Sequence, residues 1–238
     1  MDPMTVLRGL MHLAARPLIT AHFVAQLHDV RNTAFPRDAG SGVILGTNPE
    51  RVVVIGDFTA IGYGTVSHEL GIAGHFARQL ARRSGGGVEW STEAFPDLTI
   101  RTAGAVVNNE ARFARTDVVI MMIGIGDALK VTSAANWSRM LEDALAQLSA
   151  VLPIDARILI PDIPPIEVYP GIPRPIRAIV GPHAALLNRT TRTVAASHSQ
   201  AVCVAFPREH IGDVSSPQNA HASAVYSSWA RLMIDELC

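Results

Sequence analysis

A chain of 238 residues is long enough for one large α/β domain, and its high share of hydrophobic residues, 48%, excludes an intrinsically disordered chain. The formal net charge is −1 and the basic residues are dispersed, which excludes the concentrated basic face of a nucleic-acid-binding protein. The two cysteines have neither metal-ligand nor disulfide-framework spacing, which is typical of a protein from a reducing compartment.

The first segment with a helical pattern is residues 6–30, which is rich in Leu, Ile and Ala but interrupted by arginines, histidines and a proline. These interruptions do not fit a signal peptide or a membrane-spanning helix, so we expect a cytoplasmic protein. The segment is predicted to be an amphipathic helix that packs on the domain, with peripheral contact to a membrane surface or a partner as the alternative. Residues 36–50, rich in Gly, Pro and Asn, are expected to be an extended connection. Residues 1–50 would then be a helical extension with its linker, and residues 51–238 the main domain.

From residue 51 onward, short apolar runs alternate with amphipathic stretches of helical periodicity. The predicted strands are residues 51–57, 87–90, 116–124, 156–165 (a strand that runs into a proline-rich loop) and 201–206. The predicted helices are residues 67–84, with Ser67 as cap and Gly85 as stop, 133–152, 175–198 and 219–237. Five strands alternating with such helices imply a mainly parallel sheet that is covered by helices on both faces.

Ligands of such sheets bind outside the carboxyl ends of the strands. The loops at that edge are expected to begin at Gly56, near residues 96–104, at Gly124, at Pro161 and after Phe206. The candidate site is therefore sought in these loops.

Four short motifs in these loops follow one another in a familiar order. The first is GDFTAIG at residues 56–62, the second RTAGA with Gly104, and the third GIGD at residues 124–127. The fourth begins at Asp213 and is followed by a closing helix with an aromatic residue and a Trp-Ala pair. Over residues 51–237, this order resembles the SGNH, or GDSL, hydrolase superfamily of esterases, lipases and acyltransferases. The resemblance implies a flavodoxin-like three-layer α/β sandwich.

The resemblance also implies a mechanism. It calls for a Ser nucleophile, a His base oriented by an Asp three residues earlier, and an oxyanion hole with a Gly amide and an Asn side chain. In this chain Phe58 stands at the Ser position, Gly126 at the Asn position and Ser216 at the His position. Only Gly104 and Asp213 retain the family's residue types.

The leading hypothesis is therefore a pseudoenzyme without standard Ser-His esterase activity, retained to bind a ligand, such as an acyl ester or lipid-like molecule, or a partner. Asp57 and Asp127 belong to the turns themselves, and we expect both carboxylates to hold the loops through backbone N–H groups. No cofactor is expected, and His68 and His75 lack the third ligand that a metal site would need.

Two alternatives stay open. One is an active esterase or acyltransferase with a rearranged site, in which His221 is the base and Thr59 the nucleophile. Counted backwards from Tyr226 and Trp229, His221 falls within one residue of the family's His position. The other is a membrane-associated or scaffold protein that acts through its N-terminal helix.

Overall fold

A computed structural model describes residues 35–166, 173–207, 209 and 219–237 of the chain. The amphipathic helix predicted over residues 6–30 lies outside the described residues.

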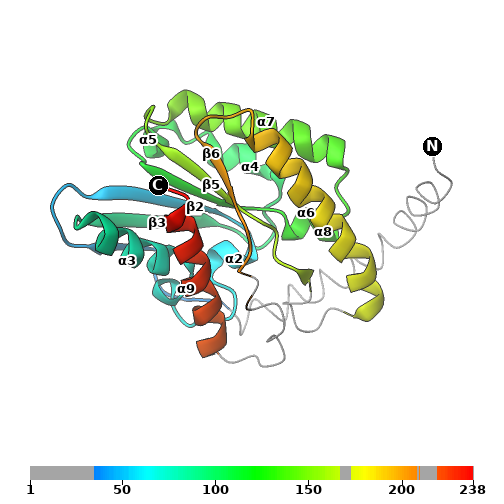
Figure 1. The fold of residues 1–238 in the computed structure, drawn as a ribbon, viewed down its shortest axis with the longest axis horizontal. Helices are drawn as coiled ribbons and strands as arrows, with labels where there is room; N and C mark the ends of the chain where they lie inside the picture. The colour runs from blue at the N-terminus through cyan, green and yellow to red at the C-terminus, as the bar shows by residue number, and fades with distance from the viewer. Residues whose placement is uncertain (1–34, 167–172, 208, 210–218, 238) are drawn as a thin grey trace.

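Six strands form one sheet in the order β1-β3-β2-β4-β5-β6 (Figure 1). The strands are β1 (Ser41–Ile44), β2 (Glu50–Gly56), β3 (Val88–Ala94), β4 (Val118–Met122), β5 (Arg157–Pro161) and β6 (Ala201–Val204). The five strands from β2 to β6 are parallel to one another, as the alternating pattern predicts. The fold class is therefore confirmed.

The first strand is the main departure from the sequence prediction. β1 pairs antiparallel with the edge of β3, with Ser41 opposite Ser91 and Ile44 opposite Val88. It lies within residues 36–50, which were expected to be a plain connection. An edge strand of four residues among glycines and serines carries too little hydrophobic alternation to be found by pattern.

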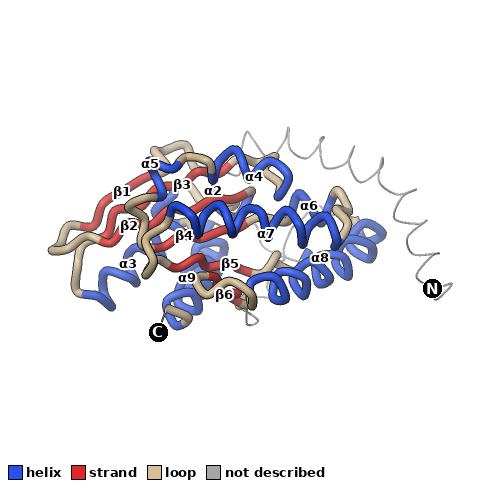
Figure 2. Tube along the Cα trace, turned by 90° about the horizontal axis from the view of Figure 1, so that it is seen from above, coloured by secondary structure: helices blue, strands red, loops and turns tan. Residues whose placement is uncertain are grey.

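Helices cover both faces of the sheet. One face carries α3 (Ile72–Ser84) and α9 (Asn219–Asp235), which pack against each other. The other carries α4 (Ile100–Val107), α5 (Glu110–Phe113), α7 (Ala134–Val151) and α8 (Arg174–Ala195), with α7 and α8 side by side (Figure 2). Two short helices, α2 (Phe58–Ile61) and α6 (Ile125–Leu129), follow directly after β2 and β4 at the carboxyl edge of the sheet.

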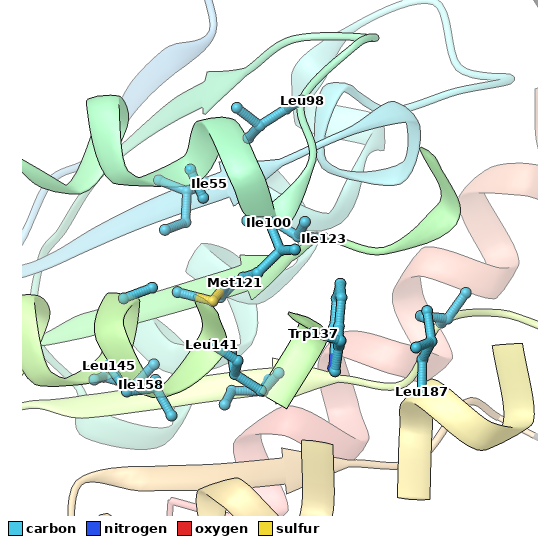
Figure 3. Close-up of a cluster of buried hydrophobic side chains, with 14 of the residues drawn as sticks. Ile55, Leu98, Ile100, Met121, Ile123, Trp137, Leu141, Leu145, Ile158 and Leu187 are labelled. Carbon is cyan, nitrogen blue, oxygen red and sulfur yellow. The ribbon is translucent and has the colours of Figure 1, made fainter. Parts of the chain in front are cut away.

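The two faces of β2 belong to two separate cores because side chains alternate along a strand. Val53 and Ile55 pack with Trp137 and Leu141 of α7, and part of this cluster is drawn in Figure 3. Val52 and Val54 pack on the α3 and α9 side. The central strand β4 is buried along its whole length, which is why its sequence, VVIMM, is continuously apolar.

The helix predicted over residues 67–84 is interrupted. His68–Leu70 form a single turn of 3-10 helix, η1, and α3 starts only after Gly71. Its end at Gly85, in the left-handed conformation at φ 69°, is confirmed. A Cβ at Gly74 would lie 2.4 Å from the backbone of Glu69, so the glycines of this segment allow η1 to fold tightly back on α3.

Candidate functional site

The corner after β2 is held unusually close to the neighbouring strand. A Cβ at Gly56 would lie 2.1 Å from the carbonyl oxygen of Met122, so only glycine fits there. The next amide, that of Asp57, donates to the same carbonyl at 3.0 Å. Gly62 then ends α2 in the left-handed region, at φ 94°. The first motif thus builds a sharp turn whose backbone is fixed against β4.

Asp57 joins this corner to the third motif. Its buried Oδ2 atom accepts hydrogen bonds from the amides of Gly124 at 3.1 Å and Ile125 at 2.9 Å. Its Oδ1 atom has no hydrogen-bond partner among the described residues. Burial raises the pKa of the carboxyl group to about 7, although the backbone donors oppose the shift. The expected loop-holding role of Asp57 is confirmed.

Asp127 has the same role in the turn after β4. Its Oδ2 atom accepts from the amide of Ile100 at 2.8 Å, and its Oδ1 atom accepts from the Thr132 hydroxyl at 2.8 Å. Burial raises the pKa of this carboxyl group as well. The Nε2 atom of His183 lies 2.8 Å from the carbonyl oxygen of Thr132, which extends the network to α8. Both carboxylates are thus engaged in holding backbone.

Phe58, which the resemblance aligned with the family's nucleophile position, is buried and only 8% exposed. Its ring centroid lies 5.8 Å from that of Phe35 and 6.4 Å from that of Tyr63, and the latter pair is edge-to-face. The ring also belongs to the core on the α7 and α8 side. The side chain of Phe58 thus packs within an aromatic cluster at the corner.

Thr59, the nearest hydroxyl, is buried in α2. Its hydroxyl forms no hydrogen bond with a histidine in the described part of the chain. Gly126 lies in α6, where a Cβ would be 3.3 Å from the carbonyl oxygen of Leu98 and 3.4 Å from Thr99 Cγ2. Gly126, the residue that the resemblance aligned with the family's Asn, is therefore closely packed against the segment that follows β3.

The assignment of Gly104 to the oxyanion hole does not fit its position. Gly104 is the fifth residue of α4, where an amide donates to the carbonyl four residues earlier within the helix. A Cβ there would lie 4.0 Å from the side chain of Gln147, an exposed residue of α7. The segment that does reach the corner starts at Phe95, whose amide donates to the carbonyl of Gly56 at 3.0 Å. Thr99 and Thr102 form a capping box, in which the side chain of each bonds to the backbone amide of the other, so α4 begins directly after Thr99.

The fourth motif is only partly described. Asp213 and Ser216 lie outside the described residues, and His221 lies in the first turn of α9 without a described side chain. The two aromatic residues of the closing helix are buried. Tyr226 donates its hydroxyl to the carbonyl of Tyr63 at 3.0 Å and so holds α9 against the loop that follows α2.

Sequence reasoning missed two histidine contacts. Asp38 Oδ1 lies 2.9 Å from Nδ1 of His68, and His75 Nε2 lies 2.9 Å from the Ser223 hydroxyl. Burial, with help from the charge of Arg78, lowers the pKa of His75 to about 4.

No three potential metal-ligating side chains gather in the part of the chain that the structure describes. No described helix is long and apolar enough to cross a membrane.

Known proteins resemble this chain in sequence. The family model of the GDSL-like lipase/acylhydrolase family matches residues 54–228. A curated relative, the GDSL-like esterase Rv1075c of Mycobacterium tuberculosis, is 28% identical over 141 residues, which cover 58% of this chain but only 43% of that protein. The chain thus matches less than half the length of this relative.

Solved structures show the same fold. The lipase Lip_vut3 from a goat rumen metagenome superposes with a TM-score of 0.60 at 13% identity and covers 77% of this chain and 99% of its own. TesA superposes with a TM-score of 0.56 at 16% identity and covers 79% of this chain and 100% of its own. With its Gly-Asp corner and the matched family model over most of its length, the chain belongs to the GDSL-like lipase/acylhydrolase family.

Proposed function

We propose that this chain is a member of the family that does not perform Ser-His ester hydrolysis and instead binds an apolar, ester- or lipid-like molecule or a partner protein. The observation that carries the proposal is the buried ring of Phe58 at the nucleophile position. A phenyl ring has no nucleophilic atom, and the Asn position, Gly126, has no side-chain donor. Removing one oxyanion donor alone costs about 10²–10³ in kcat in a working enzyme.

The direct test is hydrolysis of 4-nitrophenyl acetate and 4-nitrophenyl butyrate by the purified full chain. We expect no turnover above the buffer rate, and no gain from Phe58→Ala, which removes the ring without supplying a nucleophile. A rate well above the buffer rate that Phe58→Ala leaves unchanged would contradict the proposal.

The esterase name of the mycobacterial relative favours a second candidate, an active esterase or acyltransferase with a rearranged site. In that case His221 would be the base and Thr59 the nucleophile. His221→Ala and Thr59→Ala would each abolish turnover, while His198→Ala, a change on a histidine paired with Glu142, would leave it intact. Equal rates in all four proteins would exclude this site.

A third candidate concerns the N-terminal region. Residues 6–30 have an amphipathic pattern, and we propose peripheral contact of a cytoplasmic protein with a membrane surface through them. Flotation with anionic vesicles compares the full chain with a chain that starts at residue 35. Equal flotation of the two proteins would remove this candidate.

A further inference from the structure

The residues that lead into β1 cross the corner described above. We call residues 35–40 the strap. Its first ring, that of Phe35, lies 5.8 Å from the ring of Phe58 and 5.8 Å from that of Tyr63, at interplanar angles of 34° and 69°. The strap therefore supplies one of the three rings of the aromatic cluster.

The next strap residues continue over the same turn. A Cβ at Gly62 would lie 3.3 Å from Pro36 Cγ, so the proline packs on the end of α2. The strap ends at Gly40, whose carbonyl accepts from the amide of Thr92 at 2.6 Å just before β1 begins. Between these contacts, Arg37 and Asp38 are exposed.

The side chain of Asp38 connects the middle of the strap to the domain. The Asp38 carboxylate accepts from the backbone amide of His68, with both oxygens at 3.1 Å, and its Oδ1 atom lies 2.9 Å from the same residue's Nδ1. The Asp38 carboxylate thus contacts both the backbone and the side chain of His68. However, the Asp38 side chain is 40% exposed, and exposed ion pairs of this kind are weak.

We propose that the strap is a built-in occupant of an apolar binding site at the Gly-Asp corner, and that a neutral apolar ligand, an aromatic ring or an acyl chain, takes the place of Phe35 when the Asp38–His68 contact opens. The proposal rests on the binding function proposed above and deepens it. Phe58 and Tyr63 would form the walls of the site. An anionic ligand is disfavoured because the amides of Ile100 and Ile125, which could donate to it, already donate to the carboxyl groups of Asp127 and Asp57.

The strap can give way because its contacts through Phe35 and Asp38 lie near the surface. Before Ser41 it forms no strand pairing, Phe35 is only half-buried, and the Asp38 contact lies at the surface. Segments of this kind open locally without unfolding the domain. A ligand that binds only the open form has its apparent affinity reduced by the fraction of open molecules. Removing the ring of Phe35 removes that competition.

The experiment measures binding of N-phenyl-1-naphthylamine, a neutral probe that fluoresces in apolar sites, to the full chain. We expect Phe35→Ala to bind the probe at least about tenfold more tightly than wild type, and Asp38→Ala about threefold to fivefold more tightly, because each variant raises the open fraction. The matched control is Phe113→Ala, which removes an equal ring from the same core without touching the strap. It should bind like wild type.

Hydrogen exchange gives a second readout on the unmodified protein. The His68 amide donates to Asp38, so saturating probe should accelerate its exchange while that of the Ile125 amide, bound to Asp57, stays unchanged. Equal probe affinity in wild type, Phe35→Ala and Asp38→Ala would overturn the proposal. An equal gain in Phe113→Ala, or binding that leaves His68 exchange unchanged, would overturn it too. These experiments measure probe binding and amide exchange, not ester hydrolysis. They can therefore fail while the proposed lack of ester hydrolysis still holds.

Discussion

The Oδ2 atom of Asp57 lies 2.9 Å from the amide nitrogen of Ile125, in a position where water does not reach the carboxyl group. One buried acidic side chain therefore connects the ends of two neighbouring central strands, β2 and β4. This contact fixes the corner that carries Phe58 against the turn after β4. It also makes the stability of the domain dependent on pH.

The first prediction concerns that dependence. The folded-state pKa of Asp57 is about 7, against an ordinary value of 3.8, so between these values the folded state holds a proton that the unfolded state has released. The contribution of Asp57 to the free energy of unfolding should then fall as the pH rises from about 4 to 7, by up to about 4 kcal/mol at about 1.36 kcal/mol per unit. Asp57→Asn keeps an acceptor for the two amides and removes the titration. Urea denaturation at several pH values should show that the stability of wild type relative to Asp57→Asn falls from about pH 4 to pH 7, and a constant difference between the two proteins would contradict the assignment.

The second prediction has the opposite sign. Burial lowers the pKa of His75 from the ordinary 6.5 to about 4. Between these two pH values the unfolded state therefore binds a proton that the folded state does not bind. This residue therefore contributes stability that increases with pH across that window. His75→Gln can still bond to the Ser223 hydroxyl but does not titrate. Relative to this variant, wild type should lose stability on acidification from pH 7 to pH 5, and a constant difference between the two would refute the prediction.

The third prediction compares two glycines. Gly56→Ala places a methyl group 2.1 Å from the Met122 carbonyl oxygen, so we expect a loss above about 4 kcal/mol or a protein that does not fold. Gly85→Ala meets no atom within 4 Å and should cost only about 1–2 kcal/mol, for the left-handed conformation at φ 69°. Denaturation midpoints of the two variants measure the difference. Similar losses would mean that the close approach of β2 and β4 is relieved elsewhere.

The fourth prediction uses a strained residue. Val131, just after α6, has a φ of 52°, which is costly for a β-branched side chain, by about 1–3 kcal/mol. Val131→Gly should therefore raise the free energy of unfolding by about 1 kcal/mol. Asn48, at φ 47°, is the control because Asn tolerates this region, and Asn48→Gly should change stability by only a few tenths of a kcal/mol. Equal gains at both positions would show that Val131 carries no special strain.

The parallel strands of the fold could be predicted because they are buried and read as continuous apolar runs. β4 is the clearest case, with all five residues buried. β1 could not be predicted, because an exposed four-residue edge strand needs no apolar run and its partner β3 lies more than forty residues away in the sequence.

The sequence was enough to predict the turns that build the candidate site, but not all the contacts within it. The loop-holding roles of Asp57 and Asp127 followed from their places in the turns, and both are confirmed. The role given to Gly104 was wrong, because a glycine inside a helix cannot be told from a loop glycine until the helix start at Thr99 is known. The contact of Phe35 with Phe58 has no local signal at all, since it joins a residue before the first strand to the corner after the second.

The strap and β1 are consecutive in the sequence. A pulling force applied to the chain before residue 35 would therefore act on the strap before it acts on β1. Within residues 35–44, tension applied from the N-terminal side reaches the ring of Phe35 first, then the carboxylate of Asp38, and only then the hydrogen bonds between β1 and β3. The weakest contacts would break before the sheet is strained. The corner at Gly56 could thus be uncovered by a pull that leaves the rest of the domain folded.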